Sequence, residues 1–303
     1  MIDFKVPRLK DSILIDTKEW VQNANSPIEI RRMSGRTLPT YISEIKEINA
    51  ERGVLKNVLK KGDTVLLTKV ASDIAQYRSF AIKDGDKRYF DLPIMQVLGV
   101  FKDSEMSFSS FQMVFDKILI KKIERKEVQG LFVPNQNTMM GEVVKTGWCY
   151  FDEKWNSFPL KVKVGDKVLI RDNVTTEVIL SGETYYATNE SMVVGIFKGS
   201  DESLAALEVI NESILLEPYI PERAFYSDFL TPDLDYENED VSNFYNRDLF
   251  KIEAIDNSLT KFKKDDIILV DRNMTNYVYL NNKKYFLITG TDCVEAKIES
   301  KGG

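Results

Sequence analysis

The chain offers few side chains that could catalyse a reaction. It has no histidine among its 303 residues, which excludes histidine-dependent triads, histidine zinc sites and imidazole general bases. The two cysteines, Cys149 and Cys293, have no metal-ligand spacing around them and are predicted to be buried thiols. No glycine-rich dinucleotide-binding turn is present. We therefore expect a protein that is not an enzyme and that holds no cofactor.

One acidic stretch has a spacing that could bind a cation. Asp233, Asp235 and Glu237 alternate with other residues, as ligands do in some calcium loops. The stretch lacks the glycine at position six and the glutamate at position twelve of the helix-loop-helix calcium site. A metal site is not expected here, and protein binding is the alternative use of these carboxylates.

Charge is distributed unevenly along the chain. Residues 1–103, 104–200 and 201–303 carry net charges of +4, 0 and −10. Arg31 and Arg32 lie in a basic loop of the first segment, opposite in sign to the acidic stretch of the third. Two interpretations stay open: the loops meet, within the molecule or head to tail between neighbours, or both are solvated.

Three strand patterns that must position these loops recur with a period near 100 residues. The opening strands are predicted at 11–15, 116–120 and 212–216. A lysine, a turn pair and a buried strand follow at 59–67, 162–170 and 262–270. Each segment closes with a hairpin that carries two aromatic residues, at 84–90, 181–186 and 281–286. The recurrence predicts three copies of one all-β domain.

The middle segment resembles the co-chaperonin (GroES-like) family. Four motifs stand in the family's order, at 115–122, 130–134, 141–147 and 159–170. The resemblance implies an all-β fold of three tandem GroES-like small β-barrels, joined by short linkers at 103–107 and 199–203. The domains are predicted at 1–103, 104–200 and 201–303, with the first and third as diverged copies.

The resemblance also implies a docking site. In the family a glycine followed by aliphatic residues lies on a mobile loop that docks into the chaperonin ring. Leu131, Phe132 and Val133 occupy the matching positions. They are predicted either to dock or to form a barrel edge strand.

Aromatic residues cluster between 148 and 158, where the family has a hairpin. Aromatic residues are buried by default, yet a hairpin tip is expected to have little to bury against. Tryptophan is also enriched in interface hot spots. Trp148 and Trp155 are therefore predicted to bind a protein partner.

These observations favour a non-enzymatic structural or assembly protein, such as an accessory capsid subunit of a virus or phage. The family's ring has seven subunits, whereas three fused copies suit a three-fold position in an ordered lattice. The alternative is a divergent co-chaperonin that caps a chaperonin ring, and a carbohydrate or receptor binder is also left open. We expect no nucleic acid, because no basic stripe is present, and no membrane, because no long apolar run is present. No signal peptide is evident, so the expected location is the virion or the host cytoplasm.

Overall fold

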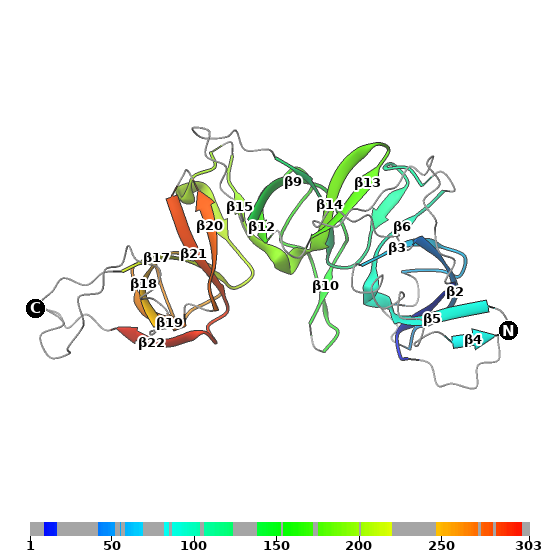
Figure 1. Ribbon diagram of the computed structural model, residues 1–303, viewed down its shortest axis with the longest axis horizontal. Helices are drawn as coiled ribbons and strands as arrows, with labels where there is room; N and C mark the ends of the chain where they lie inside the picture. The colour runs from blue at the N-terminus through cyan, green and yellow to red at the C-terminus, as the bar shows by residue number, and fades with distance from the viewer. Residues whose placement is uncertain are drawn as a thin grey trace, which may run out of the picture. The chain divides into compact units, whose positions relative to one another are not determined.

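A computed structural model describes most of the chain (Figure 1). The described residues are 9–16, 42–51, 55, 58–68, 82–84, 87–103, 106–123, 138–152, 154–171, 175–199, 201–219, 247–271, 274–280 and 283–298. Their regular structure consists of β-strands and short 3₁₀ turns, without an α-helix. Within these residues, no helix is long and apolar enough to cross a membrane.

Three antiparallel sheets and one small hairpin contain the described strands. The first sheet has β1 (Ser12–Asp16), β2 (Ile42–Asn49), β3 (Thr64–Leu67), β4 (Ile82–Asp84), β5 (Lys87–Pro93), β6 (Val97–Phe101) and β7 (Phe111–Met113). The second has β8 (Lys117–Lys122), β9 (Thr138–Thr146), β12 (Lys167–Arg171), β13 (Thr176–Leu180), β14 (Glu183–Asn189), β15 (Val193–Phe197) and β16 (Leu207–Val209). The third has β17 (Ser213–Pro218), β18 (Arg247–Ile255), β19 (Ile267–Asp271), β20 (Asn276–Leu280), β21 (Lys283–Thr289) and β22 (Val294–Ile298). The small hairpin pairs β10 (Tyr150–Phe151) with β11 (Ser157–Phe158).

The strand order is the same in each sheet. It runs β4-β5-β1-β2-β3-β6-β7 in the first, β13-β14-β8-β9-β12-β15-β16 in the second and β20-β21-β17-β18-β19-β22 in the third. Three 3₁₀ turns, Ile94–Gln96, Glu190–Met192 and Leu204–Ala206, precede β6, β15 and β16. The first two sheets each end on an additional strand, β7 or β16, that begins the next segment of the sequence. The expectation of an all-β chain is confirmed for the described residues.

The lysine-plus-turn motif has one geometry in all three places. Gly62, Gly165 and Asp265 have φ values of 90°, 93° and 71°, a region that glycine adopts without strain. In each turn the backbone N–H of a lysine donates to the carboxylate of the aspartate three residues later. These pairs are Lys60 to Asp63 at 2.8 Å, Lys163 to Asp166 at 2.7 Å and Lys263 to Asp266 at 3.0 Å. The turn chemistry predicted from the sequence is therefore confirmed.

The chain divides into two compact units. One comprises 1–123, 141–166 and 174–191, and the other comprises 124–140, 167–173 and 192–303. The first contains the first sheet with β8, β13 and β14, and the second contains β12, β15, β16 and the third sheet. This division differs from the three predicted domains, whose boundaries stay a prediction.

Alternate residues of the first-sheet strands enter two different cores. Val65 contributes to a core inside the first sheet, which also includes Phe115 from the start of the middle segment. Leu66 faces the other way, into a second core with Leu119 of β8 and Val178 of β13. The first and middle segments therefore share buried apolar surface as well as the β6–β7 pairing.

Candidate functional site

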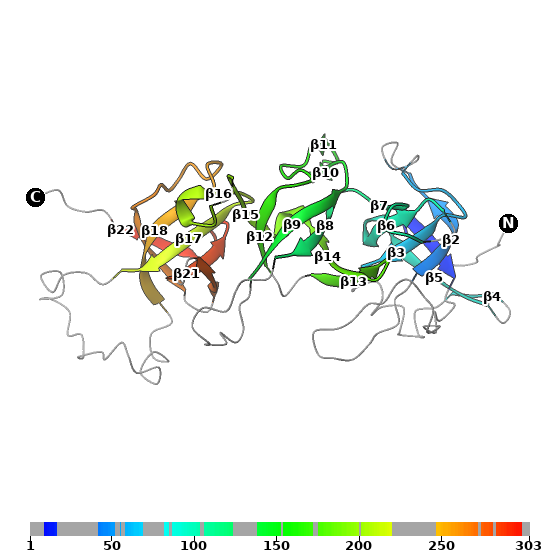
Figure 2. The same cartoon turned by 90° about the horizontal axis from the view of Figure 1, so that it is seen from above.

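The β10–β11 hairpin is the best-defined candidate binding site among the described residues (Figure 2). It follows Gly147, which lies so close to the preceding backbone that a Cβ atom there would be 2.0 Å from the Phe115 carbonyl oxygen. The Gly147 N–H donates to the Lys117 carbonyl, and the Trp148 N–H donates to the Phe115 carbonyl at 3.0 Å. The base of the hairpin is thus anchored to the turn between β7 and β8 and to the start of β8.

Asp152 fixes the hairpin tip. Its carboxylate accepts hydrogen bonds from the backbone N–H groups of Lys154 and Asn156 and from the Asn156 side chain, at 2.8 to 2.9 Å. Hydrogen bonding from the Asn156 side chain is the main cause that lowers the pKa of Asp152. The tip also holds Trp155 at φ 66°, a strained conformation for a bulky residue. This local geometry decides where the Trp155 ring points.

The hairpin has an inner and an outer aromatic face. Phe151 and Trp155 lie with ring centroids 5.4 Å apart and pack against the core inside the first sheet. The outer face carries Tyr150 and Phe158. Together with the exposed Trp148, which precedes β10 and has its ring centroid 5.6 Å from that of Phe115, these residues are called here the aromatic surface. Trp148 is 48% exposed and Phe158 is 39% exposed, and Phe158 stacks on Tyr150 at 5.2 Å. The expectation that the tip has little to bury against is wrong for Trp155, because the first-sheet core lies beneath it.

The aromatic surface can bind an apolar protein segment but offers no nucleophile. The neighbouring Cys149 is buried, and this burial raises the pKa of its thiol, which disfavours the reactive thiolate. Among the residues described, no three cysteine, aspartate or glutamate side chains form a group that could hold a metal ion. The arrangement therefore suits binding.

Most of the predicted site residues lie outside the described residues. These are Arg31, Arg32, Leu131, Phe132, Val133, Asp233, Asp235 and Glu237. Their predicted roles, and the meeting of the basic and acidic loops, stay predictions. Trp155 lies in the loop of the hairpin and packs against the first-sheet core, whereas Trp148 precedes β10, is 48% exposed and has its ring centroid 5.6 Å from that of Phe115. Partner binding by either tryptophan also stays a prediction.

A buried carboxylate that the sequence analysis missed supports the segment that follows the hairpin. Glu190 is 3% exposed, and its Oε1 accepts hydrogen bonds from the backbone N–H groups of Val162, at 2.9 Å, and Lys161. Its own N–H donates to the Asp116 carbonyl at 2.7 Å. Burial is the largest cause that raises the pKa of Glu190. A glutamate three residues before the buried strand β15 was the available signal, because the matching positions hold Ile94 and Gly290.

The two tryptophans should respond differently to truncation. Trp155→Ala is expected to lower the free energy of unfolding by about 2 kcal/mol, because it removes the contacts that this partly buried side chain makes with the first-sheet core. Trp148→Ala is the matched control and should cost less than about 1 kcal/mol, because nearly half of its surface is already exposed. Denaturant unfolding measures the free energy of unfolding of the two variants. Equal losses would contradict the closer packing of Trp155 against the first-sheet core.

Comparison with known proteins matches the middle of the chain. Residues 110–197 match the family model for the chaperonin 10 kDa subunit. The co-chaperonin GroES of Rickettsia bellii (strain RML369-C) is 40% identical over 92 residues, which cover 29% of this chain and 97% of the relative. Those of Rickettsia typhi and Rickettsia akari are 37% and 38% identical over the same shares. Through this segment, the chain belongs to the chaperonin 10 family of co-chaperonins.

Proposed function

We propose that this chain is a non-enzymatic co-chaperonin that binds a chaperonin ring through its middle segment. The observation that carries the proposal is the match to GroES over 97% of that protein's length, within residues that include the predicted docking loop. Leu131, Phe132 and Val133, which lie outside the described residues, would supply the apolar anchor. The aromatic surface of the β10–β11 hairpin would be a second protein-binding feature of the same segment.

The first and third segments are proposed to be diverged copies of the same small barrel. Matching strand orders in the three sheets support this proposal. So do the three equivalent lysine-to-aspartate turns. A further match is one backbone hydrogen bond that occurs in all three segments. The N–H groups of Ile94, Glu190 and Gly290 donate to the carbonyls of Asp11, Asp116 and Glu212, respectively. Copies without the docking motif would act as a scaffold on either side of the middle segment.

The role in a capsid lattice stays a prediction, since none of the observations above bears on a lattice. It differs from the proposed function in one measurable respect. A co-chaperonin should bind its chaperonin in a nucleotide-dependent manner, whereas a lattice subunit should bind regardless of nucleotide. Nucleotide dependence is therefore the property to measure.

Binding to an immobilised chaperonin ring, with and without ATP, tests the proposal. The wild-type chain should be retained only with ATP, and Leu131→Ser should weaken retention at least about tenfold, because it removes an apolar anchor worth about 1.4 kcal/mol or more. Val164→Ser is the matched control, since Val164 is 63% exposed in the same segment. Retention that ignores ATP, or that falls equally in both variants, would contradict the proposed function.

A further inference from the structure

Two junctions in this chain are made in the same way. In the first sheet β6 pairs with β7, and in the second β15 pairs with β16. In both cases a short strand just before the opening strand of one segment pairs with the last strand of the preceding segment. The third sheet ends on β22, which has no further strand beside it among the described residues. The two ends of the series of sheets can therefore be compared with the two junctions, position by position.

A glycine on the last strand makes room for the incoming strand. Gly99 pairs with Leu66 and Gly195 pairs with Leu169, and the equivalent residue opposite Leu269 is Ala296. A Cβ atom at Gly99 would lie 2.4 Å from the Phe111 ring of β7. At Gly195 it would lie 2.8 Å from the Glu208 carbonyl oxygen of β16. Ala296 carries that Cβ atom, so β22 cannot accept a strand in this register without displacing it.

The residues beside this position also change from apolar to charged. Leu98 and Val194, which form the bulges of β6 and β15, are both buried. The equivalent residue of β22 is Glu295, and its side chain is exposed. One residue beyond Ala296 stands Lys297, whose Nζ lies 2.7 Å from the Asp266 Oδ2. Charged residues on an edge strand oppose further strand pairing.

At the opposite end, a side chain of the same sheet accepts the equivalent hydrogen bond. The Val114 N–H donates to the Leu98 carbonyl at 3.2 Å, and the Ile210 N–H donates to the Val194 carbonyl at 3.0 Å. Both bonds cross a junction. The equivalent N–H belongs to Leu9, and it donates to the Asp91 Oδ2 of its own sheet at 2.7 Å.

Asp91 is specific to this end of the chain. It pairs with Leu14 of β1, and the matching residues opposite Leu119 and Leu215 are Ala187 and Leu287. Neither of these two side chains could accept a hydrogen bond.

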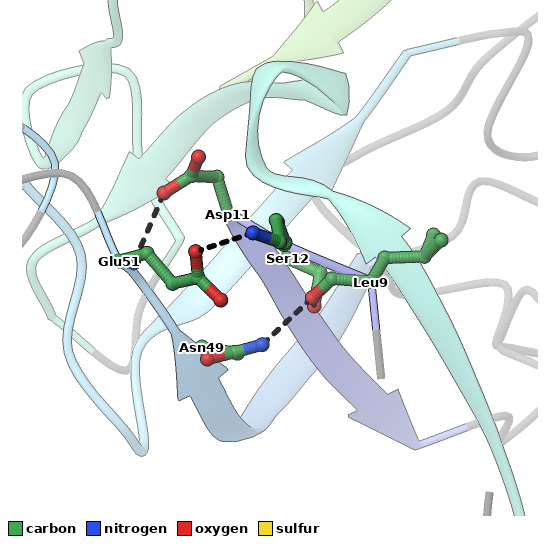
Figure 3. A network of polar contacts seen from close by, with 6 residues as sticks. Leu9, Asp11, Ser12, Asn49 and Glu51 are labelled. Carbon is green, nitrogen blue, oxygen red and sulfur yellow. Dashed lines mark hydrogen bonds and ion pairs between the residues drawn. The ribbon is translucent and has the colours of Figure 1, made fainter. Parts of the chain in front are cut away.

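The other polar groups around Leu9 are also satisfied within the first sheet (Figure 3). Asn49 Nδ2 and Ser12 Oγ both donate to the Leu9 carbonyl at 2.8 Å. The Glu51 N–H donates to Asp11 Oδ1 at 3.0 Å. The Leu9 N–H and carbonyl therefore both have hydrogen-bond partners within the first sheet.

The sequence before Leu9 adds one more difference. Pro7 lies six residues before Ile13, as Gln112 of β7 lies six before Ile118 and Glu208 of β16 lies six before Ile214. Gln112 pairs with Val100 and Glu208 pairs with Ile196 across the two junctions. Proline has no N–H to donate to such a ladder.

We propose that both ends of this chain are capped against strand pairing, so that copies of it do not join head to tail. Asp91 closes the N-terminal end, and Ala296, Glu295 and Lys297 close the C-terminal end. Pro7, which lies outside the described residues, offers no backbone N–H at the position that matches Gln112 and Glu208. Terminal units with polar outer faces serve this purpose in proteins built from repeated structural units. The inference does not depend on chaperonin binding, because it concerns only contacts between copies of the chain.

Two variants, each opened at one end, test the proposal in the full-length chain. The first carries Ala296→Gly, Glu295→Val and Lys297→Ile, which restore the residue types found in β6 and β15. The second carries Asp91→Ala and Pro7→Gln, which restore those found at the second junction. The wild type and each variant alone should sediment as a monomer of 34.9 kDa at every concentration tested. An equimolar mixture of the two variants should form a complex of about twice that mass.

Each outcome decides the matter. A wild-type chain that associates as its concentration rises would overturn the proposal. Folded variants that stay monomeric when mixed would also overturn it, because the named residues would then not be what closes the ends. If the multiple changes prevent folding, as judged by circular dichroism, the single variants Ala296→Gly and Asp91→Ala are mixed instead. A complex of about twice the monomer mass would support the proposal, and variants that stay monomeric would overturn it. A matched control pair, Val164→Ser and Met274→Ser, both at exposed apolar residues, should remain monomeric.

Discussion

Gly99→Ala is expected to lower the free energy of unfolding by about 2–4 kcal/mol, because the added methyl group has no space. Its Cβ atom would lie 2.4 Å from Cζ of Phe111 and 2.7 Å from the Gln112 carbonyl oxygen. The Phe111 ring is fully buried in the core that joins the first and middle segments. Neither the ring nor the backbone oxygen can move aside without separating β7 from β6. The variant should therefore weaken this junction before it weakens the rest of the first sheet.

Hydrogen exchange at the amides of β6 and β7, together with denaturant unfolding, measures this effect. Gly195→Ala should behave similarly at the β15–β16 junction, where the added Cβ atom would meet the Glu208 carbonyl at 2.8 Å. Ala296→Gly is the reverse control and should cost about 1 kcal/mol or less, since it only adds backbone freedom. If Gly99→Ala proves as mild as Ala296→Gly, the close approach of β7 to Gly99 is contradicted.

The local elements of this fold could be predicted from the sequence because local chemistry determines them. The positive φ values at Gly62, Gly165 and Asp265 follow from turn pairs that were visible as a repeat. The Ser181-Gly182 turn joins β13 to β14 with φ values of 52° and 82°, as expected for a tight hairpin. The repeat in the sequence also placed an opening strand, a lysine-plus-turn strand and a closing hairpin in each segment.

The junctions between segments could not be predicted in this way. Phe111, Gln112 and Met113 have the apolar–polar–apolar pattern of a strand, but the pattern does not name the partner strand. Pairing with β6 depends on the space beside Gly99, which appears only when the two strands are placed together. The polar stretch at 103–107 therefore predicts a linker, and no residue pattern in it indicates that the sheet continues into the next segment.

The candidate site was predicted in part for a similar reason. The composition of residues 148–158 indicated an aromatic hairpin, and Trp148 and Trp155 do lie just before it and in its loop. Which ring faces outward depends on the Asp152 hydrogen bonds and on the positive φ of Trp155, neither of which a periodicity reveals. Glu190 was missed because its partners are backbone N–H groups 28 and 29 residues away.

Glu190→Ala is expected to lower the free energy of unfolding by about 2–4 kcal/mol, because the backbone N–H groups of Lys161 and Val162 lose their acceptor in a buried place. Glu190→Gln should cost less, since its amide oxygen can still accept both bonds. Denaturant unfolding of the two variants separates the loss of the acceptor from the loss of the charge. Equal costs would mean that the charge, and not the two hydrogen bonds, is what matters at this position.

The pH dependence of stability gives Glu190 a second, independent signature. Because its pKa is raised in the folded state, the folded chain holds this proton more tightly than the unfolded chain does. Its contribution to the free energy of unfolding is therefore greatest below the ordinary glutamate pKa and falls as the pH rises through the raised value. Glu190→Gln should remove that fall. Glu183, whose pKa is lowered mainly by a hydrogen bond from Lys121, is the matched control: Glu183→Gln should instead remove a small contribution that is lost as the pH falls. If the two variants change the pH profile in the same direction, burial is not what perturbs Glu190.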